Sequence, residues 1–160
     1  MAQLEKRDKT LLVAILMVGS FVAILNQTLM TTALPSIMKQ MHLTSSTVQW
    51  LTSIFMLVNG IMIPITAYLT QRFTTRTLYF SALTFFIIGS VICVSTNQFN
   101  VTLIGRAVQA MGAGILMPLM QTVLFLVYPA NIRGQAMGMF GLIVGFAPAI
   151  GPTLSGWVVS

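Results

Sequence analysis

The stretch VTLIGRAVQAMGAGILMPLMQTVLFLV, residues 101–127, decides the fold of this chain. It is longer than the about 20 apolar residues that a helix needs to cross the roughly 30 Å hydrocarbon core of a bilayer. Its one charged side chain is Arg106. An arginine at the centre of a membrane helix costs at least roughly 2.5 to 3.5 kcal/mol, so a sequence that retains one usually has a use for it. Arg106 is therefore the first candidate functional residue.

Four further apolar stretches predict an all-α integral membrane protein. Hydrophobic residues make up 56% of the chain and charged residues 6%, against about 25% charged residues in soluble domains. We predict transmembrane helices at about residues 11–34, 48–69, 77–95, 101–125 and 135–159, with Pro35 ending the first. Short loops between them indicate a compact helical bundle.

The positions of Lys and Arg predict the orientation of this bundle. Six of them lie before the first span and in the second and fourth loops, namely Lys6, Arg7, Lys9, Arg72, Arg76 and Arg133. The first and third loops hold only Lys39. The positive-inside rule then makes residues 1–10 a cytoplasmic amino-terminal segment of a multi-pass protein of the cell membrane. A cleavable signal peptide is disfavoured, because the first apolar run is too long and lacks a small-residue cleavage site.

The titratable residues exclude several classes of function. Both acidic residues, Glu5 and Asp8, precede the first span, and the chain has one histidine, His42, and one cysteine, Cys93. Such a set can form neither a metal cluster nor a pair of nucleophile and base, so we expect no enzyme, metal or cofactor. The net charge of +6 could indicate nucleic acid binding. That interpretation fails because the basic residues are scattered over short loops instead of gathered on one face.

Uncharged polar residues within the spans leave two interpretations open. Asn26 and Thr28 lie in the first span and Asn59 in the second. Each can simply form a hydrogen bond between helices, which is worth about 0.6 kcal/mol on average. Several of them in one bundle favour a hydrated cavity.

Small and helix-breaking residues recur at steps of three or four along the fifth span: Gly134, Gly138, Gly141, Gly145, Pro148, Pro152 and Gly156. One face of this helix is therefore nearly bare, and a neighbouring backbone can approach it closely. The two prolines each remove a backbone donor and favour a bend, either as a rigid wall or as a hinge. Tight packing alone is the alternative.

A weak internal repeat relates the first and fourth spans. In NQTLMTTALP, Asn26 stands nine residues before Pro35, and in QAMGAGILMP, Gln109 stands nine before Pro118. The two helices run in opposite directions. Inverted repeats are typical of transporters, in which corresponding helices line a site near the middle of the membrane.

Four motifs resemble those of the drug:proton antiporters of the major facilitator superfamily, in particular the fourteen-helix branch. They are LNQTLMTTALPSI (25–37), AYLTQRFTTR (67–76), LIGRAVQAMGAG (103–114) and GFAPAIGPTLSGW (145–157), in the order and on the spans expected for that family. The resemblance covers nearly the whole chain. It implies five helices of an amino-terminal six-helix domain, with residues 11–160 as a partial transporter domain.

The resemblance also implies roles for individual residues. It places Arg106 and Gln109 on the proton-coupling pathway, and Arg72 and Arg76 at the cytoplasmic gate. The polar residues Asn26, Thr28 and Asn59 are expected by the substrate cavity. The antiporter motif of the fifth helix holds Gly145, Pro148, Gly151 and Pro152.

Departures from the family pattern limit what can be transferred. Asn26 and Gln71 stand where the family often has aspartate, and Ala67, Thr74 and Ala110 replace glycines. The role of an acidic residue in coupling or gating therefore cannot be assigned to these positions. Without a carboxylate in the spans, we expect Arg106 to bond to a backbone carbonyl, Gln109 or another amide, water, or a group on helices beyond this chain. Extension of its side chain to the outer surface is the alternative.

The function implied is the amino-terminal part of a proton-coupled multidrug efflux antiporter, with the chain a truncated product or a fragment. Its partners would be the bilayer, an amphipathic drug, protons and the remaining helices of the transporter. Two alternatives stay open, because fold does not determine substrate. The chain could be a non-transporting membrane subunit or remnant, or part of a metabolite exporter with the same fold.

Overall fold

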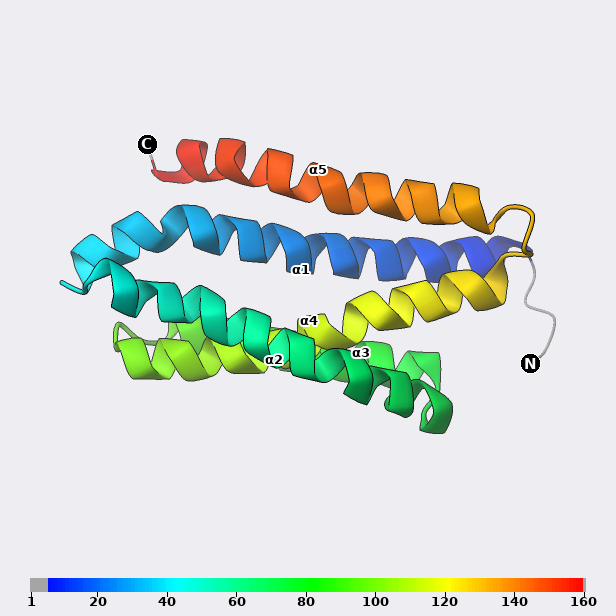
Figure 1. Cartoon of the computed structure of the whole chain (residues 1–160), viewed down its shortest axis with the longest axis horizontal. Coiled ribbons are helices and arrows are strands. Elements are labelled where there is room, and N and C mark those ends of the chain that lie inside the picture. The colour runs from blue at the N-terminus through cyan, green and yellow to red at the C-terminus, as the bar shows by residue number, and fades with distance from the viewer. Residues whose placement is uncertain (1–5, 160) are drawn as a thin grey trace.

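Five α-helices lie side by side in the computed structural model, which describes residues 6–159 (Figure 1). They are α1 (Lys6–Gln40), α2 (Ser45–Arg72), α3 (Thr75–Val94), α4 (Phe99–Val127) and α5 (Arg133–Val159). Successive helices alternate in direction, so the α2–α3 and α4–α5 loops lie at the end of the bundle where α1 begins. All five are long and apolar enough to span a membrane. The predicted multi-pass helical bundle is confirmed.

Each helix begins before its predicted span, and at α2 and α3 a capping threonine marks the start. The side chain of Thr44 caps α2 by accepting a hydrogen bond of 3.3 Å from the backbone N–H of Thr47. Thr74 caps α3 in the same way, with a bond of 3.2 Å from Thr77. These hydroxyls satisfy backbone donors that the first helical turn leaves free. The apolar part of each helix starts only afterwards.

The prediction that Pro35 ends the first helix is wrong. Pro35 lies inside α1, which continues to Gln40, and Pro118 likewise lies inside α4. A proline removes one backbone hydrogen bond. In a bilayer an unwound segment would lose several bonds without gaining water, so the helix persists. The chain reverses instead at His42, whose φ of 52° lies in the left-handed region.

Helix α4 forms the centre of the bundle. In its apolar stretch 56% of the residues are buried, more than in any other described helix. Helices α2 and α3 make their most extensive contacts with α4, whereas α1 packs mainly against α5. Arg106 therefore starts from the most buried of the described helices, which packs closely against α2 and α3.

Glycines allow α3 and α4 to pack with their backbones in contact. A Cβ atom added at Gly89 of α3 would lie 2.5 Å from the backbone nitrogen of Gln109 on α4. At Gly105 it would lie 2.7 Å from the sulfur of Cys93, and at Gly112 it would collide with the carbonyl oxygen of Ala82. Close approach of this kind is how small residues drive helix association in membranes. These three glycines position α3 against the polar face of α4.

Replacing Gly112 tests this packing. The variant Gly112→Ala should unfold more easily, by about 1 to 3 kcal/mol, because the backbone oxygen that blocks the new methyl group cannot rotate away. Gly141→Ala is the matched control, since no atom lies within 4 Å of its Cβ position on α5. The measurement is the thermal unfolding midpoint of the purified protein in detergent. Equal midpoints for the two variants would contradict the close approach.

Candidate functional site

Arg106 lies inside the bundle and does not extend to the membrane surface. Only 2% of its surface is exposed. It donates hydrogen bonds to the side-chain oxygens of Gln109 at 2.8 Å and Asn26 at 2.9 Å. A longer contact of 3.5 Å joins its Nε to the carbonyl oxygen of Leu51. The expectation that amides and a backbone carbonyl replace a carboxylate partner is confirmed.

One nitrogen of Arg106 joins the two amides of the internal repeat. Its Nη1 donates to Asn26 on α1 and to Gln109 on α4, which occupy corresponding positions in the two motifs. Gln109 is one turn beyond Arg106 on the same face of α4, as the spacing of three residues requires. The repeat therefore places two acceptors on one cation, from helices that run in opposite directions.

A chain of hydrogen bonds orients Gln109 towards Arg106. The amide nitrogen of Gln109 donates to the hydroxyl of Ser90 on α3 at 2.7 Å. That hydroxyl in turn donates to the carbonyl oxygen of Phe86 at 2.8 Å. Since the nitrogen is held by Ser90, the amide oxygen must face the guanidinium.

Helix α2 contributes an aromatic face to the same site. The ring centroid of Phe55 lies 4.4 Å from the guanidinium carbon of Arg106. A cation over a desolvated ring gains about 2 kcal/mol. The charge is thus stabilised by neutral groups from α1, α2 and α4, with α3 holding one of them in place.

A cavity of about 380 Å³ lies beside Arg106, between α1, α3 and α4. Its polar lining includes Asn26, Ser90 and Gln109, and it extends to the exposed residues Gln40 and Asn97 at the ends of α1 and α3. Most of the remaining lining is apolar. Ligand sites typically combine such an apolar wall with a few converging polar groups.

Thr28 and Asn59 do not line this cavity. Thr28 donates its hydroxyl to the carbonyl of Ile24 at 3.0 Å and packs against Gly151 of α5. Asn59 faces Gly114 of α4, where an added Cβ would lie 3.3 Å from its side-chain oxygen. Of the three residues expected at a substrate cavity, the structure brings only Asn26 to Arg106. The substrate-cavity role of all three stays a prediction.

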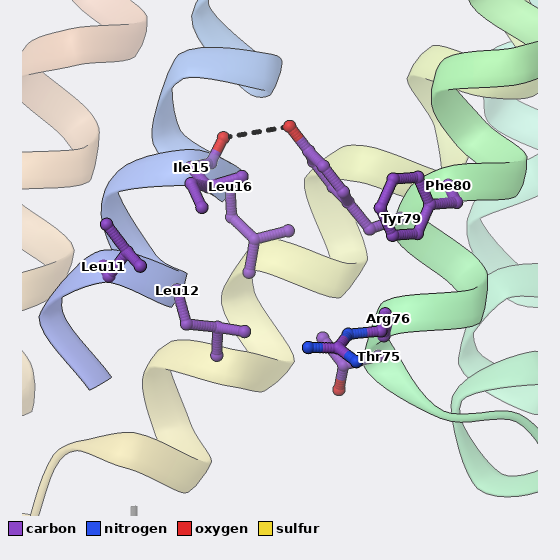
Figure 2. Close-up of a pocket in the computed structure, with 8 residues that line it drawn as sticks. All are labelled: Leu11, Leu12, Ile15, Leu16, Thr75, Arg76, Tyr79 and Phe80. Atoms are coloured by element: carbon purple, nitrogen blue, oxygen red, sulfur yellow. Dashed lines mark hydrogen bonds between the residues drawn. The ribbon is translucent and has the colours of Figure 1, made fainter. Parts of the chain in front are cut away.

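Arg72 and Arg76 lie together at the α2–α3 loop, where both are exposed. They line a hollow of about 580 Å³ against the end of α4, and Arg72 stacks over Tyr68 at 5.6 Å. Figure 2 shows a second hollow, of about 470 Å³, between α1 and α3. There Arg76 points towards α1, and the hydroxyl of Tyr79 donates to the carbonyl of Ile15 at 3.2 Å.

The predicted bare face of α5 is not covered by the described helices. No atom lies within 4 Å of a Cβ position at Gly134, Gly138, Gly141 or Gly145, and Pro148 is exposed. Gly151 behaves differently, because a Cβ there would collide with Thr28 on α1. Pro152 lies within helix α5, and its side chain is outside the described part.

Sequence reasoning missed three contributors to the site. Phe55, Ser90 and the carbonyl of Leu51 carry no motif that marks them, since each is an ordinary residue of a membrane helix. The close packing at Gly89 and Gly105 was also missed. The available signal was the spacing of two of the three glycines in the fourth span: Gly105 and Gly112 are seven residues, about two turns, apart on one face.

Removing one acceptor should destabilise the bundle. Gln109→Ala leaves a buried cation with one bond fewer, which costs about 1 to 3 kcal/mol. Gln121→Ala is the matched control, because Gln121 is an exposed amide on the same helix. Chemical or thermal unfolding of the purified variants measures the difference. If Gln109→Ala were as stable as Gln121→Ala, the bond to Arg106 would have no structural role.

Comparison with known proteins agrees with this architecture. Residues 16–160 match the sequence model of the Major Facilitator Superfamily. The uncharacterized MFS-type transporter YcnB of Bacillus subtilis is 55% identical over 152 residues, which cover 95% of this chain and 32% of YcnB. The lincomycin resistance protein LmrB of the same organism is 42% identical over 144 residues, 90% of this chain and 30% of LmrB.

A more distant relative is the multidrug export protein EmrB of Haemophilus influenzae. It is 31% identical over 148 residues, which cover 92% of this chain and 29% of EmrB. The chain spans about a third of the length of these curated relatives. The match to the family model extends over nearly all of the described helices. The chain belongs to the Major Facilitator Superfamily.

Proposed function

We propose that this chain forms the amino-terminal part of a proton-coupled antiporter that exports amphipathic drugs across the cell membrane. One observation carries the proposal: the buried Arg106 joins α1 to α4 beside a cavity. A charge that only anchored a helix at the membrane surface would not need amide partners from two helices inside the bundle. The names of LmrB and EmrB refer to lincomycin resistance and multidrug export.

Arg106 would act in coupling without carrying the transported proton. A guanidinium keeps its proton in proteins. Its fixed positive charge instead favours the ionised form of any acid that approaches it. From residue 9 onward the chain has no acidic side chain. We therefore place the proton-carrying acid on helices beyond this chain, with Arg106 and Gln109 facing the coupling pathway.

The cavity beside Arg106 suits an amphipathic substrate. Apolar side chains such as Leu29, Met30 and Val94 provide most of its wall, and the amide of Asn26 adds a polar contact. Apolar walls bind the greater part of a drug's surface, while few polar groups orient it. A metabolite with the same balance of polar and apolar surface would fit as well, so the substrate has to come from transport measurements.

The placement of the cations supports a cytoplasmic amino terminus. In Figure 1 the start of α1, the α2–α3 loop and the α4–α5 loop share one end of the bundle. Lys9, Arg72, Arg76 and Arg133 belong to these segments, whereas Lys39 lies at the end of α1 near the opposite end. The positive-inside rule makes the cation-rich end cytoplasmic. Arg72 and Arg76 would then form part of the cytoplasmic gate.

Drug accumulation tests the proposal. Cells that express the full reading frame containing this chain should accumulate less drug than empty-vector cells, and a protonophore should abolish the difference. Arg106→Ala should raise accumulation to the vector level. Arg106→Lys should restore little efflux, because lysine lacks the Nε that contacts the Leu51 carbonyl and the planar guanidinium that lies over Phe55. Lys39→Gln is the control, since Lys39 is exposed. Accumulation that is unaffected by the protein would sink the proposal.

Labelling from outside the cell tests the orientation. In a Cys93→Ala background, a membrane-impermeant maleimide should label Gln40→Cys in intact cells and should label Gln71→Cys only after the cells are opened. Both positions are exposed, and they lie at the ends of α1 and α2 that face opposite sides of the bundle. The reverse pattern would place the amino terminus outside.

A second candidate function is that of a non-transporting membrane subunit. It is favoured by the open face of α5, where no atom of another described helix lies near Gly134, Gly138, Gly141 or Gly145. Such a face can dock another membrane helix. If the full reading frame gave no efflux but the chain copurified with a partner protein through α5, this function would replace the first.

A further inference from the structure

We propose that the cavity between α1, α3 and α4 binds a small monovalent anion, chloride in the cell, at Arg106 and Asn26. Neither the motifs nor the family match assigns a ligand of this charge to the chain. The inference does not depend on what the full protein transports, because its test measures anion binding directly.

The charge balance of the bundle is the first step. Among the described side chains, residues 9–151 and 153, every residue of fixed charge is positive and none is acidic. Five of these cations lie near helix ends, where solvent ions can neutralise them. Arg106 is the exception, with 2% exposure. A buried charge is stable only when it is paired or fully hydrogen-bonded.

The donors of Arg106 are the second step. A guanidinium carries five N–H donors. Two bonds leave Nη1, and one long contact leaves Nε. Nη2 is buried and has no acceptor within hydrogen-bond distance among the described residues. The acceptors present are neutral, so they leave the positive charge uncompensated.

Asn26 provides a second donor for the same ligand. Its side-chain oxygen accepts from Arg106, so its NH2 group is the free end of the amide. Within the described part of the chain no acceptor takes this NH2 group, and Asn26 lines the cavity together with Arg106. A guanidinium N–H and an amide N–H on one cavity are a suitable pair for an anion, whereas a cation would meet two donors and a like charge.

The cavity has room and access for such an ion. Its volume of about 380 Å³ is more than ten times the about 30 Å³ that one water molecule occupies. Besides Arg106 its lining includes Thr102, Thr96 and Asn97, and Asn97 is exposed in the loop between α3 and α4. An anion can therefore enter from solution without crossing apolar packing.

The experiment is equilibrium binding of chloride-36 to the purified full protein that contains this chain. The background salt is gluconate at constant ionic strength, so that chloride is the only halide present. We expect saturable binding of about one chloride per polypeptide, which bromide displaces. The control is Arg133→Gln, which removes a partly buried cation at the α4–α5 loop. This variant should bind chloride as the wild type does.

Two variants separate binding from folding. Arg106→Gln should lose the site, but it removes a buried group and could unfold the protein. Asn26→Asp keeps Arg106 and supplies an internal carboxylate in place of the anion, so chloride should bind about tenfold more weakly or worse. Its thermal midpoint should no longer rise when chloride replaces gluconate, unlike that of the wild type.

Either of two results would overturn the proposal. The first is wild-type protein that binds no chloride saturably. The second is Asn26→Asp protein that binds chloride as tightly as the wild type, because the ion would then sit elsewhere. If the full wild-type protein bound chloride but exported no drug, the proposed function would be wrong and the anion site would still be supported.

Discussion

The structure depends on holding one positive charge in a bilayer without a negative one. Arg106 obtains its partners from three helices: Asn26 on α1, the Leu51 carbonyl on α2 and Gln109 on α4. Helix α3 contributes Ser90, which orients Gln109. Because hydrocarbon offers no substitute for these acceptors, the four helices must meet at this point. The cation therefore selects the arrangement of the bundle as well as a candidate site.

The glycines of α3 and α4 make that meeting possible. Gly89 lets the backbone of α3 touch α4 at Gln109, and the next residue, Ser90, then reaches the Gln109 amide. A larger residue at Gly89 would move Ser90 away and leave the amide of Gln109 free to turn. Backbone packing and the polar site are thus a single feature, in which apolar contact between small residues determines the geometry of the hydrogen bonds.

Much of the fold and part of the site could be predicted from the sequence. Hydropathy located all five spans, and the absence of carboxylates predicted neutral partners for Arg106. Gln109 was among the partners expected for Arg106. The link to Asn26 was not expected, because it depends on how α1 packs against α4, 80 residues away in the chain. The predicted helix end at Pro35 was wrong, because the effect of a proline in water differs from its effect in lipid. Thr28 lies two residues from Asn26, and helical rotation points it elsewhere. Asn59 faces Gly114, eight residues along α4 from Arg106.

The two hydrogen bonds that Arg106 Nη1 donates to Asn26 and Gln109 have a mechanical consequence. Any displacement of α1 away from α4 would strip a cation of an acceptor in a medium that cannot replace it, so these two helices must travel together as one rigid body. At Gly134, Gly138, Gly141 and Gly145 the face of α5 meets no other described helix. A neighbouring surface could slide along it with little resistance. The same chain thus combines an interior in which α1 and α4 are held together by hydrogen bonds with an outer glycine face along which a neighbour can move.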